Sequence, residues 1–553
     1  MANEIDQDDL NAAFWELTND QIAVLRPHGE IRQTSAGEVL FHQGDPSCDF
    51  FVVLEGEVDL IEPGVISPRV IGTRRAGEIV GELSLLTEEV AYLSAVVTSP
   101  GSVLAITPDA LRHLVTTDPG FSDFLLRAFL FLRSHLVSIG AGLKIVGSAY
   151  SPDALRLRRF AARNRIPHDW IDVEADPIAE SLLRQFGVRP EETPVVIWKG
   201  AEVLRNPADA QLGQILGLGD ELLPDTQHDL VIIGAGPAGL AAAVYGASEG
   251  LSTLVLEATA TGGQAGMASR IENYLGFPAG LSGIELASRA LVQAEKFGAA
   301  LAVPREATAL RQEGSDYIIT LADGEEIRAG CVIIAVGARY RKLGVPGEAE
   351  LAGANVYYAA TQVEAQTCQG EHVAVVGGGN SAGQAALFLA ERASKVSLVA
   401  RCSDLEEDMS RYLVDRILNT PNIEVIVQHQ VQAMLGDGEL TGVRIAHILT
   451  GQERSLDIAA LFVFIGADAP TAWLADTLEL DEKGFIKTGR AVKSAPAWRS
   501  APRDPTLFEA SLPGVFAVGD VRSGAIRRAA SAVGEGSMAV RLCHMYLAEV
   551  RGG

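Results

Sequence analysis

The feature that most constrains the fold of this chain is the stretch Asp229–Gly239, which reads DLVIIGAGPAG. Its apolar residues predict a buried strand that runs into a glycine turn and then into an alanine-rich helix over Leu240–Ser248. Such a turn lets the backbone approach a pyrophosphate, whose charge the helix dipole favours. A second apolar strand, Thr253–Leu256, ends on Glu257, where a carboxylate is suited to ribose hydroxyls. The pattern predicts a dinucleotide-binding domain rather than a tight strand–helix turn alone.

A second strand–turn–helix unit follows later in the chain. Apolar residues lead into Gly377-Gly378-Gly379-Asn380-Ser381-Ala382, and a helical pattern comes next. When the two glycine turns are aligned, the position of Glu257 falls on Ala400, and Arg401 comes directly after it. A carboxylate repels a 2′-phosphate whereas a guanidinium binds one, so we expect FAD at the first unit and NADPH at the second.

Composition excludes several classes of function. The chain has 553 residues and a formal net charge of −26, which argues against nucleic acid and anionic membranes as partners. No apolar run reaches the roughly 20 residues that span a bilayer, and the acidic start MANEIDQDDL is unlike a signal peptide, so we expect a cytoplasmic protein. The five cysteines include no CxxC pair, so neither a disulfide framework nor a four-cysteine zinc site is predicted, and no metal site is expected.

The first part of the chain has short β-like runs broken by glycine. After a helical lead-in over residues 1–28, the predicted strands are Glu38–His42, Phe50–Leu54, Val58–Ile61, Val70–Thr73, Leu93–Thr98 and Ser102–Thr107. Short strands at close spacing are typical of a small β-barrel or jelly roll. An amphipathic helix is predicted next, over Phe121–Leu136.

The segment GEVLFHQGDPSCDFFVVLEGEVDLI and the later Gly81-Glu82-Leu83 resemble cyclic-nucleotide-binding domains of the catabolite-activator type, over about residues 15–136. In that family the glutamate of the second segment takes the ribose hydroxyl, a role that Glu82 fits. The family's phosphate-binding arginine falls on Leu93, so the charge-assisted pair with a cyclic phosphate is missing. We therefore expect a structural or regulatory domain, with ordinary cyclic-nucleotide binding as the less favoured alternative.

The stretch Leu143–Leu216 alternates between strand and helix patterns, with a further strand at Glu202–Leu204. This order resembles the thioredoxin/glutaredoxin fold, and Thr193-Pro194 matches the cis-proline position of that fold. The redox CxxC of the family falls on Ser148 and Ser151, and two hydroxyls cannot form a disulfide. The resemblance thus implies a docking or spacing domain that carries no dithiol chemistry.

The rest of the chain, about residues 228–553, closely resembles the low-molecular-weight thioredoxin reductases. The motifs GAGPAG, TGGQ, ENYLGFP, GGGNSA and GVFAVGD occur in the order of that family. The resemblance implies FAD contacts at Gly234, Gly236, Pro237, Ala238, Gly239, Glu257, Gly262, Gly263, Gln264, Asn273, Gly519, Asp520 and Ala529. It implies NADPH contacts at Gly377, Gly379, Asn380, Ser381, Ala382 and Arg401. Cys402 replaces the family's second arginine, but Arg401 still leads us to expect that NADPH reduces the flavin better than NADH.

The departure from the family lies just before the second glycine turn. The family carries CATC where this chain has Ala359-Ala360-Thr361-Gln362, so both redox thiols are absent. Cys368 is interpreted as a packing residue, and Cys331 and Cys543 as core residues of a strand and a helix. The sequence therefore identifies no catalytic residue at the positions of Ala359 and Gln362.

The combined interpretation is an NAD(P)H-dependent FAD oxidoreductase that passes hydride from NADPH to FAD and then to an acceptor without a protein dithiol. A ferredoxin or flavodoxin, a quinone, oxygen and a small disulfide all remain open as the acceptor. A redox or nucleotide sensor without turnover and a flavin-binding scaffold are the alternatives. The resemblance also implies a homodimer.

The expected fold class is a multidomain α/β chain with an N-terminal β-barrel or jelly roll, a thioredoxin-like domain and two Rossmann-like three-layer dinucleotide-binding domains. The expected boundaries are residues 1–140 for the cyclic-nucleotide-binding-like domain, 141–217 for the thioredoxin-like domain and 218–227 for the linker. The FAD-binding domain is expected at residues 228–345 and 465–553, with the NADPH-binding domain at 346–464.

Overall fold

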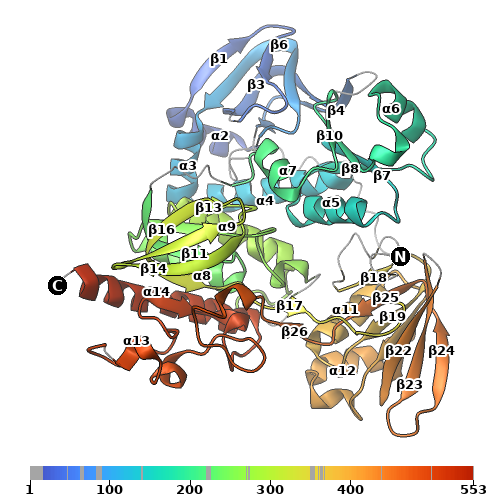
Figure 1. Ribbon diagram of the computed structural model, residues 1–553. Coiled ribbons are helices and arrows are strands. Elements are labelled where there is room, and N and C mark those ends of the chain that lie inside the picture. Colours follow the sequence, from blue (N-terminus) through green and yellow to red (C-terminus); the bar gives the residue numbers. More distant parts are fainter. Residues whose placement is uncertain are drawn as a thin grey trace. The chain divides into compact units, whose positions relative to one another are not determined.

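The computed structural model (Figure 1) describes residues 16–46, 48–62, 68–81, 90–138, 141–219, 226–268, 271, 274–348, 351, 355–358, 360, 365, 368–436, 439–499 and 501–551. The chain falls into two compact units. The first is Met1–Leu223 with Ala258–Ala260 and Glu295–Arg305, and the second is Pro224–Glu257, Thr261–Ala294 and Glu306–Gly553. Within the described residues, no helix is long and apolar enough to cross a membrane.

The first unit begins with an antiparallel sheet, drawn in blue in Figure 1. Helix α2 (Asn19–Leu25) precedes the sheet and is capped by Thr18, whose hydroxyl accepts a hydrogen bond from Gln21 N at 3.3 Å. The strands are β1 (Glu30–Thr34), β2 (Val39–Phe41), β3 (Phe50–Glu62), β4 (Arg69–Arg74), β5 (Ile79–Val80) and β6 (Ser94–Ile106). They pair in the order β1-β6-β3-β4, with β2 on β6 and β5 on β3. No pairing joins β1 to β4 among the described strands, so the predicted barrel or jelly roll is not a closed barrel.

Two long strands replace four of the predicted short ones. The single strand β3 spans the predicted Phe50–Leu54 and Val58–Ile61, and β6 likewise merges the two later predictions. The glycines that were expected to end strands lie at bulges instead: Gly56 has a φ of 93°, and a Cβ on Gly101 would lie 2.0 Å from Glu55 O. A bulge disturbs the pairing of two strands locally without ending either strand. The predicted division into four strands was therefore wrong.

Two helices, α3 (Pro108–Thr117) and α4 (Pro119–Ser138), follow this sheet. The prediction of a helix over Phe121–Leu136 is confirmed by α4. Helix α3 was not predicted, because the sequence pattern places Thr107 at the end of a strand. In the structure Thr107 caps the helix, and its hydroxyl accepts from Ala110 N at 3.4 Å. The sheet and the helices enclose a hydrophobic core that includes Leu93, which is 4% exposed.

The second domain of the first unit follows the predicted alternation of strands and helices. Its elements are β7 (Leu143–Gly147), α5 (Pro152–Arg163), β8 (His168–Asp172), α6 (Ala179–Gln185), β9 (Val195–Trp198), β10 (Glu202–Arg205) and α7 (Asp209–Ile215). The sheet has the order β10-β9-β7-β8, with β7 parallel to β8 and antiparallel to β9. The Thr193-Pro194 peptide bond that leads into β9 is cis, as predicted. These features agree with the expected thioredoxin-like fold.

Buried side chains join these two domains of the first unit. The ring of Tyr92 packs edge-on against Trp198, with the ring centroids 6.0 Å apart, in a core that both domains share. Arg133 of α4 is 3% exposed and donates to Arg165 O at 2.8 Å and to Asn164 O at 3.3 Å. Both carbonyls lie just beyond the end of α5, where a helix leaves acceptors without partners. The guanidinium therefore completes the end of a helix in the neighbouring domain.

We expect Arg133→Met to lower the free energy of unfolding of the first unit by about 1–3 kcal/mol, because the carbonyls of Asn164 and Arg165 lose the donor that the buried Arg133 supplies. Since the two domains share a core, the backbone amides of both should lose their protection from hydrogen exchange together. Hydrogen exchange of the full chain in denaturant measures this protection. The matched control is Arg184→Met, which removes only an exposed pair with Glu180 and should change the free energy by less than about 0.5 kcal/mol. An effect of Arg133→Met no larger than that of the control would contradict this role.

The second unit contains two dinucleotide-type domains, and the first is built on a mixed sheet. Parallel strands β12 (Thr253–Leu256), β11 (Gln227–Ile233) and β16 (Glu326–Ile334) lie side by side. Beyond them, β16 pairs with β15 (Asp316–Leu321) through its first half and with β27 (Val515–Ala517) through its second, and β14 (Ala307–Glu313) pairs with β15. Helix α8 (Pro237–Ser248) follows β11, and α14 (Ala529–Arg551) packs so closely on it that a Cβ on Gly536 would lie 2.1 Å from Ala238 O.

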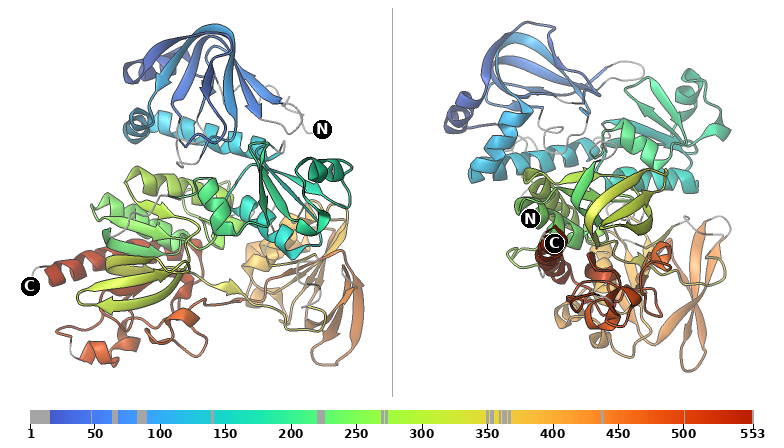
Figure 2. Two further views of the ribbon diagram at one scale, coloured as in Figure 1. Left: turned by 45° about the horizontal axis from the view of Figure 1, so that its top comes forward. Right: turned by 60° about the vertical axis from the view of Figure 1, so that its left-hand side comes forward.

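The second domain of this unit is built on a parallel sheet with the order β18-β25-β19-β20-β21. Its strands and helices are β18 (Val356–Tyr357), β19 (His372–Val376), α11 (Asn380–Ala390), β20 (Lys395–Val399), α12 (Arg411–Leu418), β21 (Ile423–Ile426) and β25 (Ala460–Val463). A separate antiparallel sheet of β22 (His429–Gly436), β23 (Leu440–His447) and β24 (Glu453–Asp457) is drawn in orange in Figure 2. The remaining elements are η1 (Arg26–His28), η2 (Pro190–Glu192), η3 (Ala265–Met267), α9 (Gly283–Lys296), β13 (Ala300–Ala302), β17 (Arg339–Tyr340), η4 (Leu405–Glu407), β26 (Ala467–Asp468), η5 (Ala472–Leu474), η6 (Gly489–Val492), α13 (Pro496–Arg499) and η7 (Gly519–Val521).

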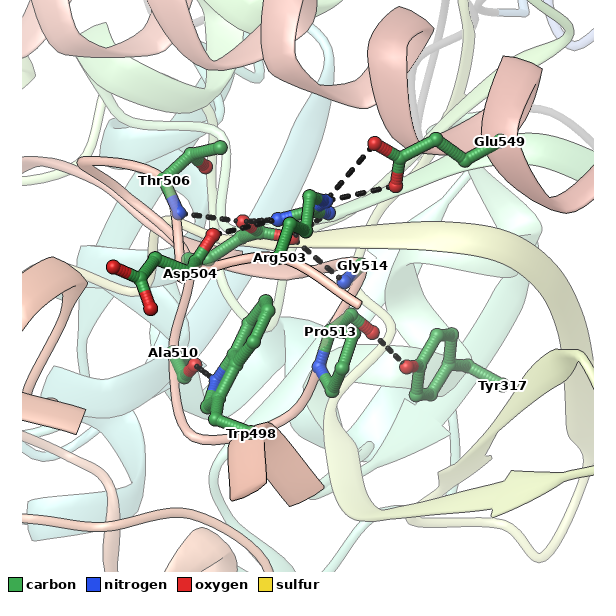
Figure 3. A network of polar contacts seen from close by, with 10 residues as sticks. Tyr317, Trp498, Arg503, Asp504, Thr506, Ala510, Pro513, Gly514 and Glu549 are labelled. Carbon is green, nitrogen blue, oxygen red and sulfur yellow. Dashed lines mark hydrogen bonds and ion pairs between the residues drawn. The ribbon is translucent and has the colours of Figure 1, made fainter. Parts of the chain in front are cut away.

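An ion pair between the partly exposed Arg503 and the buried Glu509 organises the irregular segment that precedes β27 (Figure 3). The carboxylate of Glu509, which is 0% exposed, accepts from Arg503 Nη1 at 2.7 Å, from Arg503 Nη2 at 2.8 Å and from Thr506 N at 2.7 Å. Arg503 Nε also donates to Glu549 of α14 at 2.8 Å. Burial raises the pKa of Glu509, but the hydrogen bonds from Arg503 and Thr506 outweigh it and hold the pKa below its usual range. The pair therefore ties this segment to the C-terminal helix.

Candidate functional site

The first glycine turn, Gly234–Gly239, joins β11 to α8 at the carboxyl end of the parallel strands. Gly234 has a φ of +109°, and a Cβ on it would lie 2.4 Å from Ala335 O. A Cβ on Gly239 would lie 1.8 Å from Gly234 O. Both positions require glycine for the strand and the helix to pack closely.

Gly236, in contrast, faces open space. A Cβ placed on it would meet only Gly263 Cα, at 3.9 Å, so the surrounding protein does not exclude a side chain there. Pro237 and Ala238 follow as the first residues of α8, whose backbone amides point out of the helix N-terminus. Open space before a helix of this length, lined by glycine, is what a pyrophosphate requires.

The residues around this turn carry two further polar groups. Glu257 directly follows β12, and its Oε2 accepts a hydrogen bond from Ala235 N at 2.8 Å, so it also shapes the turn. Gly262 and Gly263 have φ values of +95° and +54°, which place the following Gln264 beside the turn. The side-chain carbonyl Oε1 of Gln264 is buried, and none of the described residues donates to it. A buried acceptor in this state is suited to a donor from a bound group or a water molecule.

The C-terminal part of this domain adds an acid at the end of β27. Asp520 follows Gly519, which has a φ of +71° and whose N donates to Glu535 Oε2 at 2.7 Å. Burial raises the pKa of Asp520, and the charge of Arg527 only partly opposes it. Ala529 is the first residue of α14. Glu535 was not predicted as a site residue, but it pairs with Arg522 and accepts a hydrogen bond from the Gly519 backbone.

The second glycine turn has the same division of roles as the first. Gly377 has a φ of +147°, and a Cβ on it would lie 2.4 Å from Phe464 O. A Cβ on Gly379 would meet only Asp408 O, at 3.9 Å. Asn380 begins α11 and accepts from Ser410 N at 2.7 Å, while Ser381 is exposed and Ala382 is buried. The space in front of Gly379 is again open at the N-terminus of a helix.

Arg401 lies two residues beyond the end of β20, separated from it by the buried Ala400, and its side chain is exposed. The structure thus places it at the strand end that corresponds to Glu257 in the first domain. The loop after Arg401 carries several acidic residues.

Several predicted positions lie outside the described residues, namely Glu82, Asn273, Ala359 and Gln362. In the first unit, Leu93 belongs to the core and offers no charge to a phosphate. In the thioredoxin-like domain, Ser151 caps α5 by accepting from Ala154 N at 3.3 Å, and Ser148 Oγ accepts from Tyr150 N at 3.2 Å. Both hydroxyls are therefore used in local structure.

The cysteines are free thiols, and most are buried. Cys331 lies in β16 and Cys543 in α14, both fully buried, which confirms their interpretation as core residues. Cys368 is also buried, in the core of the second dinucleotide-type domain. Only Cys402 is partly exposed.

The two turns together fit two dinucleotides. The protein itself requires Gly234 and Gly239 in the first turn and Gly377 in the second, and each turn has one further glycine that borders open space at a helix N-terminus. The unpartnered Gln264 Oε1 adds an acceptor beside the first turn, and Glu257 and Asp520 add acidic groups. Glycine turns with an adjacent acid are suited to bind the pyrophosphate and hydroxyls of a flavin nucleotide.

Comparison with known proteins agrees with this geometry. Residues 228–536 match the family model described as Pyridine nucleotide-disulphide oxidoreductase, and residues 31–118 match that of the Cyclic nucleotide-binding domain. The thioredoxin reductase of Treponema pallidum is 34% identical over 323 residues, which are 58% of this chain and 98% of that protein. The thioredoxin reductase of Mycolicibacterium smegmatis is 36% identical over 330 residues, which are 59% of this chain and 98% of that protein.

Solved structures give the same result. The thioredoxin reductase of Lactococcus lactis is 30% identical, with a TM-score of 0.53, and the comparison covers 58% of this chain and 99% of that one. The T. acidophilum enzyme is 32% identical, with a TM-score of 0.52 and coverage of 58% and 98%. Thioredoxin reductases and their close relatives use FAD and NADPH. The chain belongs to the pyridine nucleotide-disulphide oxidoreductase family as a relative of the thioredoxin reductases, and it carries a cyclic nucleotide-binding domain ahead of the oxidoreductase part.

Proposed function

We propose that this chain is an NAD(P)H-dependent flavin oxidoreductase that reduces its acceptor without a dithiol of its own. The observation that carries the proposal is the combination of two complete nucleotide turns with alanine and glutamine at positions 359 and 362. The chain has no CxxC pair, and the described cysteines other than Cys402 are buried. A thiol relay needs two accessible sulfurs, so the acceptor must meet the flavin directly.

The residues of the first site have separate tasks in this proposal. The backbone of Gly234–Gly239 and the N-terminus of α8 bind the pyrophosphate of FAD. Glu257 binds ribose hydroxyls, and Asp520 binds the polyol chain. Gly377, Gly379, Asn380, Ser381, Ala382 and Arg401 bind the nicotinamide nucleotide. The bound flavin supplies the hydride chemistry, and the protein supplies binding and orientation.

The proposal leaves four acceptor classes: a ferredoxin or flavodoxin, a quinone, oxygen, and a small disulfide. The net charge of −26 favours neither nucleic acid nor anionic membrane as a partner. We propose a homodimer in the cytoplasm, in line with the resemblance to the thioredoxin reductases.

Anaerobic mixing of the purified protein with NADPH tests the proposal. We expect rapid bleaching of the flavin absorbance, followed by steady NADPH oxidation when a quinone, oxygen or a small aromatic disulfide is added. Absence of bleaching would contradict the proposal.

A sensor without turnover is the second candidate function. It is favoured because the first domain has the buried Leu93 in place of a phosphate-binding arginine. The second has Ser148 and Ser151, whose hydroxyls are used in local structure, in place of redox thiols. Bleaching by NADPH without turnover by any acceptor would support the sensor and exclude the enzyme.

A further inference from the structure

The loop that follows β20, residues 401–410, packs over the second glycine turn. Cys402 Sγ lies 3.0 Å from the place that a Cβ on Gly378 would take, and Ser410 N donates to Asn380 Oδ1 at 2.7 Å. In a Rossmann unit the residues after this strand meet the adenosine ribose and distinguish a 2′-hydroxyl from a 2′-phosphate. The loop therefore lies where nucleotide selectivity is decided.

The charge in this loop is mostly negative. Arg401 is exposed, and none of the described residues forms an ion pair with it. Four carboxylates follow within seven residues, those of Asp404, Glu406, Glu407 and Asp408. Burial and the charges of Glu407, Asp408 and Asp404 raise the pKa of the neighbouring Cys402 thiol. The formal charge of residues 401–408 is therefore −3, from one arginine and four carboxylates.

One of these carboxylates also holds the local hydrogen-bond donors. Glu407 Oε1 accepts from Ser403 Oγ at 2.5 Å, from Ser403 N at 3.1 Å and from Asp404 N at 3.2 Å. These hydrogen bonds lower the pKa of Glu407, so it is ionised at neutral pH. Backbone amides and a serine hydroxyl are groups that bind phosphate oxygens, and here a side chain of the protein already occupies them.

We propose that Glu407 sets the nucleotide selectivity of this chain, because its carboxylate occupies the donors that a 2′-phosphate would use and opposes Arg401. NADPH must displace this carboxylate to use Ser403 and Asp404, whereas NADH need not. The preference for NADPH that Arg401 alone predicts is therefore reduced to less than about tenfold. This inference rests on the proposed use of a pyridine nucleotide but not on the identity of the acceptor.

Calorimetric titration of the flavin-loaded protein with NADP⁺ and with NAD⁺ tests the inference independently of turnover. Glu407→Ala frees the donors and removes the charge, so we expect NADP⁺ to bind about tenfold more tightly, with NAD⁺ changed by less than about twofold. Glu407→Gln removes the charge but keeps an acceptor in place, and it should give a smaller gain.

The matched control is Glu406→Ala, which removes the same charge from the same turn. Glu406 accepts none of these hydrogen bonds and lies 3.8 Å from Arg411, so this variant should change NADP⁺ binding by less than about threefold. Equal effects of Glu406→Ala and Glu407→Ala, or no effect of either, would overturn the role of Glu407. If the unaltered protein binds neither nucleotide, the proposed use of a pyridine nucleotide fails, and this inference fails with it.

Discussion

Arg503→Met will lower the free energy of unfolding of the second unit by about 3–5 kcal/mol, the cost typical of leaving one charge of a buried pair without its partner. Glu509 is fully buried, and two of its hydrogen bonds come from the guanidinium of Arg503. Methionine fills a similar volume but donates nothing, so the carboxylate keeps the donors of Thr506 and the backbone donor Gly514 N among the described residues. Denaturant unfolding followed by the fluorescence of Trp498, whose ring lies 5.2 Å from the Arg503 guanidinium, measures the loss.

The free energy of unfolding that Arg503→Met loses relative to the unaltered protein will also depend on pH. Because the pKa of Glu509 is lowered in the folded protein, its ionised form stabilises the fold at pH values above the ordinary glutamate pKa. That contribution is lost as the pH falls through the folded-state pKa of Glu509. In the variant, protonation of Glu509 neutralises a buried charge that has lost its partner. The difference in free energy of unfolding between the variant and the unaltered protein should therefore shrink between neutral pH and about pH 4.

Two control variants separate this pair from general effects of charge. Lys493→Met removes an exposed pair with Asp504 in the same part of the chain and should change the free energy by less than about 1 kcal/mol. Arg503→Lys keeps the charge but cannot donate to Glu509 and Glu549 at once. Its loss in free energy of unfolding should therefore lie between those of Arg503→Met and Lys493→Met. A loss in free energy of unfolding for Arg503→Met equal to that for Lys493→Met would contradict the role of the pair of Arg503 and Glu509.

Gly236→Trp will reduce the flavin content from one FAD per chain by more than about tenfold, because an indole would fill the space in which the pyrophosphate binds. The protein itself leaves room for a Cβ at this position, since the nearest atom to it is Gly263 Cα at 3.9 Å. The absorbance ratio of flavin to protein after purification measures the effect. Full flavin content in Gly236→Trp would contradict the assignment of this turn.

Alanine variants of the same turn distinguish loss of ligand from loss of fold. Gly236→Ala should keep the circular dichroism and unfolding behaviour of the unaltered protein. Gly239→Ala places a Cβ 1.8 Å from Gly234 O and should destabilise the domain as well as remove the flavin. An equal loss of stability in Gly236→Ala and Gly239→Ala would mean that the fold itself, and not a bound ligand, requires glycine at position 236.

The parts of the fold with strong local patterns could be predicted from the sequence. The strand Thr253–Leu256 matches β12 residue for residue, because a continuous apolar run between turn residues has few alternatives. The glycine turn before α8 was predicted for a similar reason, since its dihedral angles and close contacts demand glycine. Local physical constraints of this kind are visible in a single sequence.

Features that depend on distant partners could not be predicted in this way. Gly56 and Gly101 look like strand ends, but their bulges exist only because β3 and β6 pair with each other. The ion pair of Arg503 and Glu509 lies in a segment without periodicity, so no pattern marks it. Glu535 and Glu407 act on backbone amides, and a sequence does not show which amides lack a partner.

The central claim is that this chain reduces its acceptor without a protein dithiol. Direct reduction of thioredoxin requires an enzyme disulfide that takes electrons from the flavin and then exchanges with thioredoxin. The chain contains no CxxC pair, and its resemblance to the thioredoxin reductases assigns the two thiol positions to Ala359 and Gln362, while Ser148 and Ser151 take them in the thioredoxin-like domain. Cys368 is buried, and a single cysteine cannot form an internal disulfide.

NADPH oxidation coupled to thioredoxin reduction, measured for the unaltered protein and for Cys368→Ser, tests this claim most directly. Activity that depends on Cys368 would assign that residue to catalysis rather than to packing. The account predicts no thioredoxin reduction by either protein, although both pass electrons to a small acceptor. Thioredoxin reduction at rates typical of the dithiol enzymes, in both proteins, would contradict it.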